Sequence, residues 1–150
     1  NINMAIDFEW HIQGQVILAK ISGVTDGEDL RTGQSIVEPW MDTSSAEMVH
    51  IIFDCWQLKR IAFSVSQELS TLKYLRHAKM GAFIVVGLPA TQRAIANLMG
   101  GMITRMTHAK FSTAKDMEMA MATIRKLDAS VPNVVPTSNK PITESTRPTP

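Results

Sequence analysis

One loop of the sequence combines residue types that bind anions. Thr91 and Arg93 lie in "GLPATQR" (87–93), between an apolar run and an amphipathic segment. The free N–H groups and the dipole at a helix N-terminus attract phosphate or carboxylate, and a guanidinium adds to that attraction. Thr91 and Arg93 are therefore a candidate anion-binding pair. In the alternative, Pro89 ends a strand and Thr91 caps the helix, because the loop lacks the glycines that cradle phosphates.

The residue types that hold metals or act as nucleophiles are scattered along the chain. His11, His50, His77 and His108 fall in four different predicted elements, without the i, i+4 spacing that places two imidazoles on one helix face. The single cysteine, Cys55, has no base beside it and is expected to be a small buried hydrophobic residue. We therefore expect no metal site, no cofactor and no enzyme activity.

Asp54, Ser64 and Ser66 form a second candidate site. Asp54 ends the apolar run "MVHIIFD" (48–54), which predicts a buried strand, and the two serines precede the next amphipathic stretch. Ser64 and Gln67 have the spacing of a capping box, so Ser64 is expected to begin a helix. The sequence therefore predicts a loop between a strand and a helix, which is a candidate docking surface for a partner protein.

Strand and helix patterns alternate around these residues. Five segments have strand composition, and the first two form a hairpin that turns at Gly14: residues 7–12, 15–22, 48–54, 82–88 and 107–111. Four helices are predicted, each from a capping residue: Thr25 with Glu28, Ser64 (as far as Ala78), Thr91, and Ser112 or Thr113. The order β-β-α-β-α-β-α-β-α predicts an α/β fold with a mixed, mostly parallel sheet flanked by helices.

Each predicted helix carries an apolar stripe that would face a core. The stripes are Leu30, Gly33, Val37, Trp40 and Met41; Val65, Leu69, Leu72 and Leu75; Ile95, Leu98, Met99 and Met102; and Met117, Ala120, Met121, Ile124 and Leu127. Pro39 is expected to bend or stop the first helix near Glu38, and Gly100 with Gly101 to break the third. Met119 points away from the last stripe, and flexible methionines suit a dimer or ligand surface as well as a core.

Composition sets further limits on function. The 150 residues suffice for one domain, residues 1–128, followed by a segment rich in Pro, Ser and Thr, residues 129–150, which is predicted to be a disordered tail. Basic residues dominate the second half of the chain, but few aromatic residues accompany them, which disfavours nucleic-acid binding. The longest apolar run, "MGAFIVVGL" (80–88), is too short for insertion across a membrane, and a lone cysteine fits the cytoplasm.

The chain resembles the SpoIIAA-like branch of the STAS (sulphate transporter and anti-sigma factor antagonist) superfamily. The resemblance covers roughly residues 8–127 and rests on the order of five features: "HIIFDCWQLKR" (50–60), "LRHAKMG" (75–81), "FIVVG" (83–87), a short strand ending in Phe111, and a capped helix with alanines. It implies a mixed sheet flanked by helices. It also implies a non-enzymatic regulatory role through contacts with a protein partner. A homodimer is a separate option, because the methionine-bearing helices could present apolar surface.

Anti-sigma factor antagonists of this family carry a phosphorylated serine where the loop meets the helix, in an Asp-Ser-x-Gly sequence. A phosphate there adds about two negative charges and remodels the docking surface. Ser64 lies near the position of that serine, but Ala62 and Val65 stand where the acid and the glycine are expected. The resemblance therefore implies a degenerate phosphoswitch in which Ser64 is kept as a helix cap.

Two further functions stay open from the sequence. Some SpoIIAA-like relatives resemble CRAL-TRIO lipid-binding domains, which would make the methionine-bearing helices a site for a small apolar ligand or lipid. The order of Asp54, Thr91 and Lys110 resembles the phosphoacceptor site of response-regulator receiver domains. Those domains also need an acidic pair after the first strand to hold magnesium, and here no acid follows "KISGV" (20–24) before Asp26.

Overall fold

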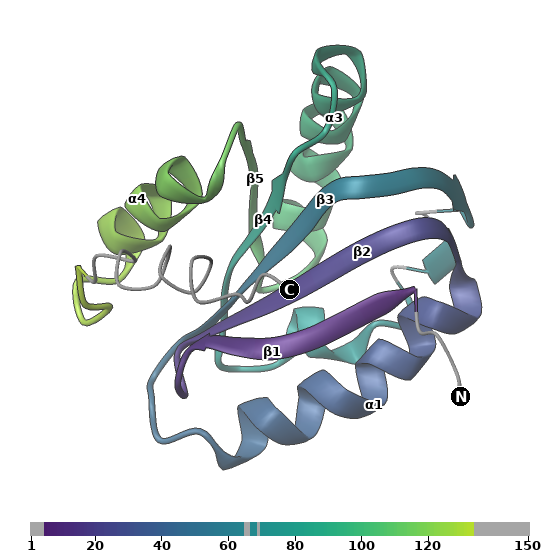
Figure 1. Cartoon of the computed structure of the whole chain (residues 1–150). Helices are drawn as coiled ribbons and strands as arrows, with labels where there is room; N and C mark the ends of the chain where they lie inside the picture. The colour runs from purple at the N-terminus through teal and green to yellow at the C-terminus, as the bar shows by residue number, and fades with distance from the viewer. Residues whose placement is uncertain (1–4, 65–66, 69, 134–150) are drawn as a thin grey trace, which may run out of the picture.

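A five-stranded sheet forms the centre of the computed structural model, which describes residues 5–64, 67–68 and 70–133 (Figure 1). The strands lie side by side in chain order: β1 (Ile6–Ile12), β2 (Val16–Asp26), β3 (Val49–Ala62), β4 (Met80–Val86) and β5 (Lys110–Ala114). β1 runs antiparallel to β2, and every other neighbouring pair is parallel. The helical elements are α1 (Gly27–Thr43), the 3₁₀ helix η1 (Lys73–Arg76), α3 (Ala90–Met106) and α4 (Met117–Leu127). The predicted α/β class, mixed sheet and element order are confirmed.

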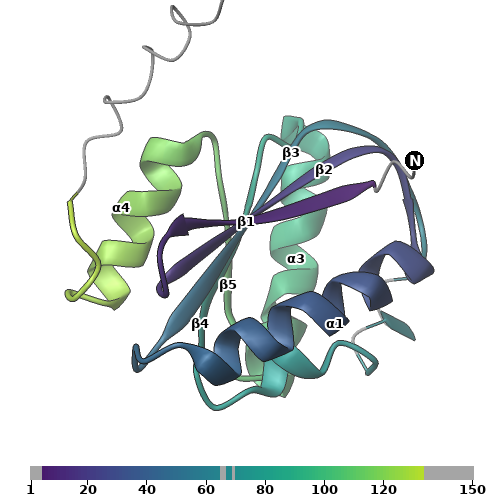
Figure 2. The same cartoon turned by 60° about the horizontal axis from the view of Figure 1, so that its bottom comes forward.

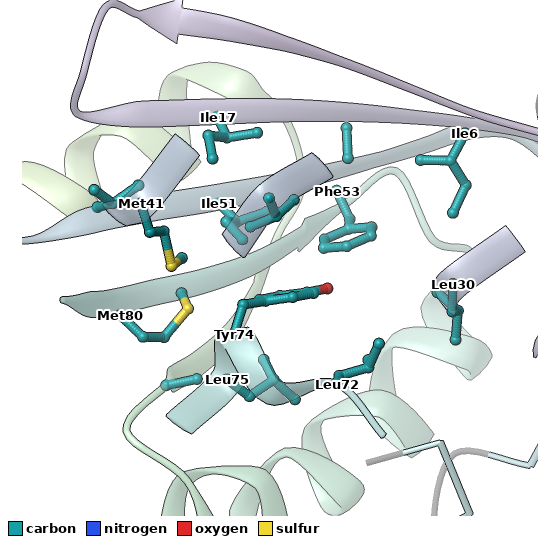
Figure 3. Close-up of a cluster of buried hydrophobic side chains, with 14 of the residues drawn as sticks. Ile6, Ile17, Leu30, Met41, Ile51, Phe53, Leu72, Tyr74, Leu75 and Met80 are labelled. Carbon is teal, nitrogen blue, oxygen red and sulfur yellow. The ribbon is translucent and has the colours of Figure 1, made fainter. Parts of the chain in front are cut away.

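The helical elements divide between the two faces of the sheet (Figure 2). α1, η1 and α3 cover one face, over the larger core, where Ile51 and Phe53 of β3 meet Tyr74 of η1 (Figure 3). α4 covers part of the other face, where Ile84 and Ile124 are buried. The central strands are thus covered on both sides, which explains why their sequences are continuously apolar.

β2 passes into α1 without a loop. The Asp26 carboxylate accepts a hydrogen bond from the Asp29 N–H, and the Asp29 carboxylate accepts one from the Asp26 N–H, each at 2.9 Å. This capping box lies one residue beyond the predicted pair of Thr25 and Glu28. Side chains alternate along β2, so the Thr25 side chain is buried and the Asp26 side chain is exposed.

α1 continues through Pro39 to Thr43, so the helix does not stop near Glu38, which was one of the two outcomes predicted there. A proline inside a helix removes one backbone hydrogen bond. Val37 and Met41 on either side of it are nevertheless fully buried, and Trp40 stacks on Trp10 of β1 with ring centroids 5.3 Å apart. Packing of these side chains holds the last turn where the backbone is weakened.

β3 is much longer than the predicted strand 48–54, and the predicted loop after Asp54 was therefore wrong. Residues 57–62 pair in parallel with residues 22–26 of β2, beyond the point where β4 ends. We call this two-stranded extension the ribbon. Register shifts against β2 mark bulges in β3, so the inward residues Cys55, Leu58 and Ile61 are three apart rather than two. A strand is predicted from apolar residues that alternate with period two, so this spacing does not indicate one.

The second predicted helix is not continuous in the described residues. The Ser64 carbonyl oxygen accepts hydrogen bonds from the N–H groups of Gln67 and Glu68 at 3.1 and 3.0 Å, which opens a short turn. The chain then turns again and enters η1, where Leu75 is buried as predicted. The remaining predicted helix residues Val65, Ser66 and Leu69 lie outside the described residues.

β5 and α4 begin about three residues later than predicted. Ser112 and Thr113 belong to β5, and Asp116 caps α4 by accepting a hydrogen bond from the Met119 N–H at 2.9 Å. The α4 stripe is buried at Ala120, Met121 and Ile124, but Leu127 is 39% exposed.

Val131 is also buried, so packing extends past the predicted domain boundary at residue 128. Residues 134–150 of the predicted tail lie outside the described residues.

α3 is unbroken at Gly100 and Gly101, contrary to the prediction. A Cβ atom on Gly100 would lie 2.1 Å from Cδ1 of Phe111 in β5, so the glycine allows the helix to approach the sheet. A Cβ atom on Gly101 would meet only Nη1 of Arg105, at 3.6 Å. The two neighbouring glycines therefore have different roles, and only Gly100 is required by packing.

Alanine at these two glycines is expected to act in opposite directions. Gly100→Ala forces Phe111 or α3 to move, and should lower the free energy of unfolding by about 1–3 kcal/mol. Gly101→Ala fits the space available and should raise it by up to about 1 kcal/mol through helix propensity. Urea unfolding of both variants measures the difference. Equal effects of the two substitutions would contradict the close contact between α3 and Phe111.

Candidate functional site

Asp54 lies inside β3 and shapes the bulge there. It pairs with Lys20 of β2 and Val86 of β4, and its Oδ1 accepts a hydrogen bond from the Trp56 N–H at 3.1 Å. At a bulge one residue loses its strand partner, so its N–H needs another acceptor. The Asp54 carboxylate supplies that acceptor at the start of the ribbon.

The ribbon separates Asp54 from the two predicted serines. About eight residue steps of extended strand lie between Asp54 and Ala62, a span of roughly 25 Å. Ser64 follows Ala62 and is exposed, and Ser66 lies outside the described residues. Asp54 and Ser64 therefore do not share one loop. The degenerate phosphoswitch, with Ser64 kept as a helix cap, stays a prediction, and so does any use of Ser64 or Ser66 as a phosphosite.

The predicted anion-binding pair lies in the first turn of α3. Pro89 is the N-cap and contributes no side-chain hydrogen bond, while Thr91 is exposed. Nη1 of Arg93 donates to the Leu88 carbonyl oxygen at 3.1 Å, so the guanidinium folds back over the preceding loop. This contact uses one of the donors that an anion would need. Anion binding by Thr91 and Arg93 stays a prediction.

Lys110 is not brought to Asp54. Lys110 pairs with Ala82 near the start of β4, whereas Asp54 pairs with Val86 near its end. Four residues of strand separate those two levels by roughly 13 Å. The geometry of the sheet therefore does not assemble the phosphoacceptor site that the order of Asp54, Thr91 and Lys110 resembles.

A buried histidine and aspartate join α4 to the sheet. His50 of β3 is fully buried, and its Nε2 lies 2.8 Å from Oδ2 of Asp128, the residue that ends α4. The Ala82 N–H donates to His50 Nδ1 at 2.9 Å. Gly81 makes room for the ring, because a Cβ atom there would lie 2.5 Å from Nδ1. A histidine inside an apolar strand was the signal in the sequence, but its partner is 78 residues away.

Both ring nitrogens of His50 are engaged. Because Nδ1 accepts the Ala82 N–H, the ring proton lies on Nε2 and is donated to Asp128. Burial lowers the pKa of His50, which keeps the ring neutral. For Asp128, desolvation favours the neutral acid, but hydrogen bonds from His50 and Ser130 outweigh it and lower the pKa. Neither nitrogen is left to act on a substrate, so the pair holds α4 in place.

An apolar pocket lies between the ribbon, α3 and the larger core, with a volume of about 170 Å³. Leu30, Phe53, Leu72 and Tyr74 surround the part of it next to η1 (Figure 3). The rest of the wall includes Leu58, Ile61, Phe63, Phe83, Met99, Ile103 and Phe111. Cys55 also lines it, and burial raises the pKa of its thiol to about 12, so the group stays neutral. The pocket is therefore built to hold apolar groups.

Two polar residues line the end of the pocket nearest α1. The Thr25 hydroxyl is buried and has no hydrogen-bond partner in the part of the chain that the structure describes. Glu68 is also buried, and its carboxylate accepts from Nη1 of Arg31 at 3.2 Å and from the Thr71 hydroxyl at 3.1 Å. Glu68 is thus satisfied by protein groups, whereas Thr25 is not.

α3 turns part of its predicted core stripe outward. Ile95 and Leu98 are 59% and 81% exposed, whereas Met99 and Ile103 line the pocket. Met106, two turns beyond Leu98, is also exposed, and Met102 between them is partly buried. Residues three and four apart lie on one side of a helix. We call Ile95, Leu98, Met102 and Met106 the α3 stripe.

Comparison with known proteins identifies the fold. No protein-family model and no curated protein sequence matches the chain. An uncharacterized protein of the DUF3478 family with a SpoIIAA-like fold, from Shewanella loihica PV-4, matches with a TM-score of 0.59 and 14% identity, over 82% of this chain and 97% of that one. The anti-sigma factor antagonist SpoIIAA in its unphosphorylated form matches with a TM-score of 0.54 and 14% identity, over 81% and 97%. The chain has the SpoIIAA-like fold that the resemblance implied.

The described residues contain neither a cluster of metal ligands nor a helix that could span a membrane. No three His, Cys, Asp or Glu side chains in residues 5–64, 67–68 and 70–133 lie close enough together to hold a metal ion. Among the helices of the same residues, none has the length and apolar character needed to cross a membrane.

The His50–Asp128 pair is expected to make stability fall with acid. In the unfolded chain, His50 binds a proton below a pH of about 6.5, whereas its lowered pKa in the folded protein keeps the ring neutral there. Protonation therefore favours the unfolded state, and the free energy of unfolding should decrease as the pH falls from 7 toward 5. The lowered pKa of Asp128 adds a second loss below a pH of about 4. Chemical unfolding at a series of pH values measures both.

A glutamine at position 50 isolates the contribution of the histidine. His50→Gln should lower the free energy of unfolding at pH 7 by about 1–3 kcal/mol, because the Ala82 N–H loses its acceptor. The loss should shrink as the pH falls, since the wild type alone carries the titrating ring. His108→Gln, at an exposed histidine, is the control. If the free energy of unfolding changed with pH in the same way for wild type and His50→Gln, His50 would not be held neutral in the folded protein.

Proposed function

We propose that the chain is a non-enzymatic regulatory protein that acts in the cytoplasm by binding a protein of the anti-sigma factor kind. The proposal is supported by the match to SpoIIAA, an anti-sigma factor antagonist, over 97% of that protein. It is also supported by His50 and Asp128, which bond to each other and to the backbone instead of facing a substrate. A protein with this fold and this use of its polar groups works through its surface.

The α3 stripe carries the proposal. Leu98 is the most exposed large apolar residue among those described, and Ile95 and Met106 extend the same side of the helix. Soluble proteins rarely leave a row of large apolar side chains in water unless it binds something. A partner that covers the stripe would bury these three side chains at a gain of about 1.5–3 kcal/mol each.

The position of α3 suits a docking role. The adjoining side of the helix closes the pocket through Met99 and Ile103, and Gly100 lets the helix lie against Phe111 of β5. The helix is therefore fixed to the sheet on one side, while Ile95, Leu98 and Met106 of the stripe face outward. A rigid helix that presents apolar anchors at spacings of three and four is a common way for one protein to bind another.

Acidic substitution in the stripe is expected to abolish partner binding without unfolding the domain. Ile95→Glu with Leu98→Glu changes exposed positions, so the free energy of unfolding should stay within about 0.5 kcal/mol of wild type. Affinity for the partner should fall at least about a hundredfold, because both anchors become charged. The measurement is capture from an extract of the native host, followed by calorimetry with the purified anti-sigma factor that is captured.

A matched variant on α4 tests whether the stripe is the surface used. Met119→Glu changes an exposed apolar residue on the opposite face of the sheet and should leave binding unchanged. Equal capture by wild type and the stripe variant would refute docking through α3. Sedimentation of the wild type gives a second check: a dimer that the stripe substitutions dissolve would show that a second copy covers the stripe, against the proposed partner.

A further inference from the structure

We propose that the free edge of β3 in the ribbon, residues 57–62, binds an extended acidic segment of a partner protein as an additional strand. The apolar side chains of that segment enter the pocket, and its acidic side chains lie beside Lys59 and Arg60. This edge is a different surface from the α3 stripe, so the proposal does not depend on the protein partner proposed there.

In the described residues, β3 has a strand partner on only one side along the ribbon. Its pairs with β4 end at Asp54 and Val86, whereas its pairs with β2 continue to Ala62 (Figure 1). Gly87 follows with a φ of 91°, a left-handed conformation that turns the chain out of the line of β4. No described residue forms a backbone hydrogen bond with the other edge of residues 57–62. Alternate residues of this edge therefore present N–H and C=O groups that another strand can pair with.

The pocket opens beside this edge. Leu58 and Ile61 line it from the ribbon, Leu88 lines it just after β4, and Ala96 lines it from α3. Ile61 is 45% exposed although it lines the pocket, so the pocket is open to water along the ribbon. Successive side chains of a strand point to opposite faces, so every second side chain of an added strand would meet these apolar walls. Strand addition typically gains affinity from backbone hydrogen bonds and specificity from such pockets.

Lys59 and Arg60 determine the charge of the partner segment. Both are exposed, and Arg60 pairs with the exposed Val24 of β2, so it lies on the side of the ribbon away from the pocket. Lys59 is the additional residue of the bulge that follows Leu58. Neither cation forms an ion pair with a described residue. Acidic side chains on the outer face of an added strand would lie next to them, and complementary charges of this kind select a partner.

The same two cations argue against a second copy as the occupant. Two copies paired edge to edge would place Lys59 and Arg60 of one beside those of the other, and like charges brought together in an interface are unfavourable. Lysine on an exposed edge strand is a common protection against such self-pairing. The edge therefore disfavours its own copy and favours an acidic strand.

Three capped hexapeptides of matched apolar content test the proposal. They are the alternating acidic peptide Glu-Val-Glu-Leu-Glu-Val, its basic counterpart Lys-Val-Lys-Leu-Lys-Val, and the block-ordered acidic peptide Glu-Glu-Glu-Val-Leu-Val. Each is titrated into the full chain and followed by the NMR signals of the N–H groups of residues 57–62. Wild type should bind the alternating acidic peptide at least about tenfold more tightly than either of the others. This peptide should also slow, by at least about tenfold, the exchange of those N–H groups that do not pair with β2.

Two double variants separate the edge from general attraction between charges. Lys59→Glu with Arg60→Glu should reverse the preference, so that the basic peptide binds more tightly than the acidic one. Lys115→Glu with Lys126→Glu makes the same change of charge at exposed positions of the β5–α4 region and should keep the wild-type preference. Both variants should unfold at the same urea concentration as wild type, because only exposed side chains change.

Three results would overturn the proposal. The first is the absence of shifts at residues 57–62 when the alternating acidic peptide is added to wild type. The second is an equal effect of the two double variants on the preference between peptides, which would show attraction without a specific edge. The third is a wild-type dimer in sedimentation whose formation slows exchange at residues 57–62, which would show that a second copy covers the edge.

Discussion

The parallel pairing of β2 and β3 beyond the end of β4 is the interaction on which the other features depend. Because β4 stops at Val86, the ribbon extends past the larger core without a third strand beside it, and its inward residues Leu58 and Ile61 are only partly buried. Leu58 and Ile61 face the space that α3 and η1 do not fill, and this space is the pocket. The same pairing carries β2 as far as Asp26, where its carboxylate caps α1. Strand pairing, helix start and pocket thus follow from one extension.

The opposite face of the sheet is held in a different way. α4 buries few large side chains, and its end is fixed by the hydrogen bonds that run from Ala82 through His50 to Asp128. Such a buried pair contributes little net stability, since removing it from water is costly, but it specifies one arrangement. The face with the pocket and the α3 stripe leaves large apolar side chains exposed. On the other face, α4 is held to the sheet by the hydrogen bond between His50 and Asp128. This division suits a protein that recognises partners on one side.

The fold could be predicted from the sequence because its strands and helices mostly have regular apolar patterns. The apolar run 82–88 predicts a strand that corresponds to β4, although β4 begins and ends two residues earlier, and the α4 stripe is buried as predicted at Ala120, Met121 and Ile124. The ribbon could not be, because its bulges space Cys55, Leu58 and Ile61 by three. The apolar pattern therefore predicts a loop after Asp54, where the structure has the continuation of β3. The pocket, Thr25 and the His50–Asp128 pair depend on contacts between distant parts of the chain, which no local pattern contains.

Hydrogen exchange at residues 57–61 tests most directly whether β3 continues as a strand. If the ribbon forms, backbone N–H groups that pair with β2 exchange slowly, and NMR detects close contacts between Gln57 and Ser22 and between Ile61 and Thr25. Fast exchange throughout this segment, without contacts to β2, would show the loop that the sequence predicted. Such a result would contradict the account of the pocket and of the separation between Asp54 and Ser64.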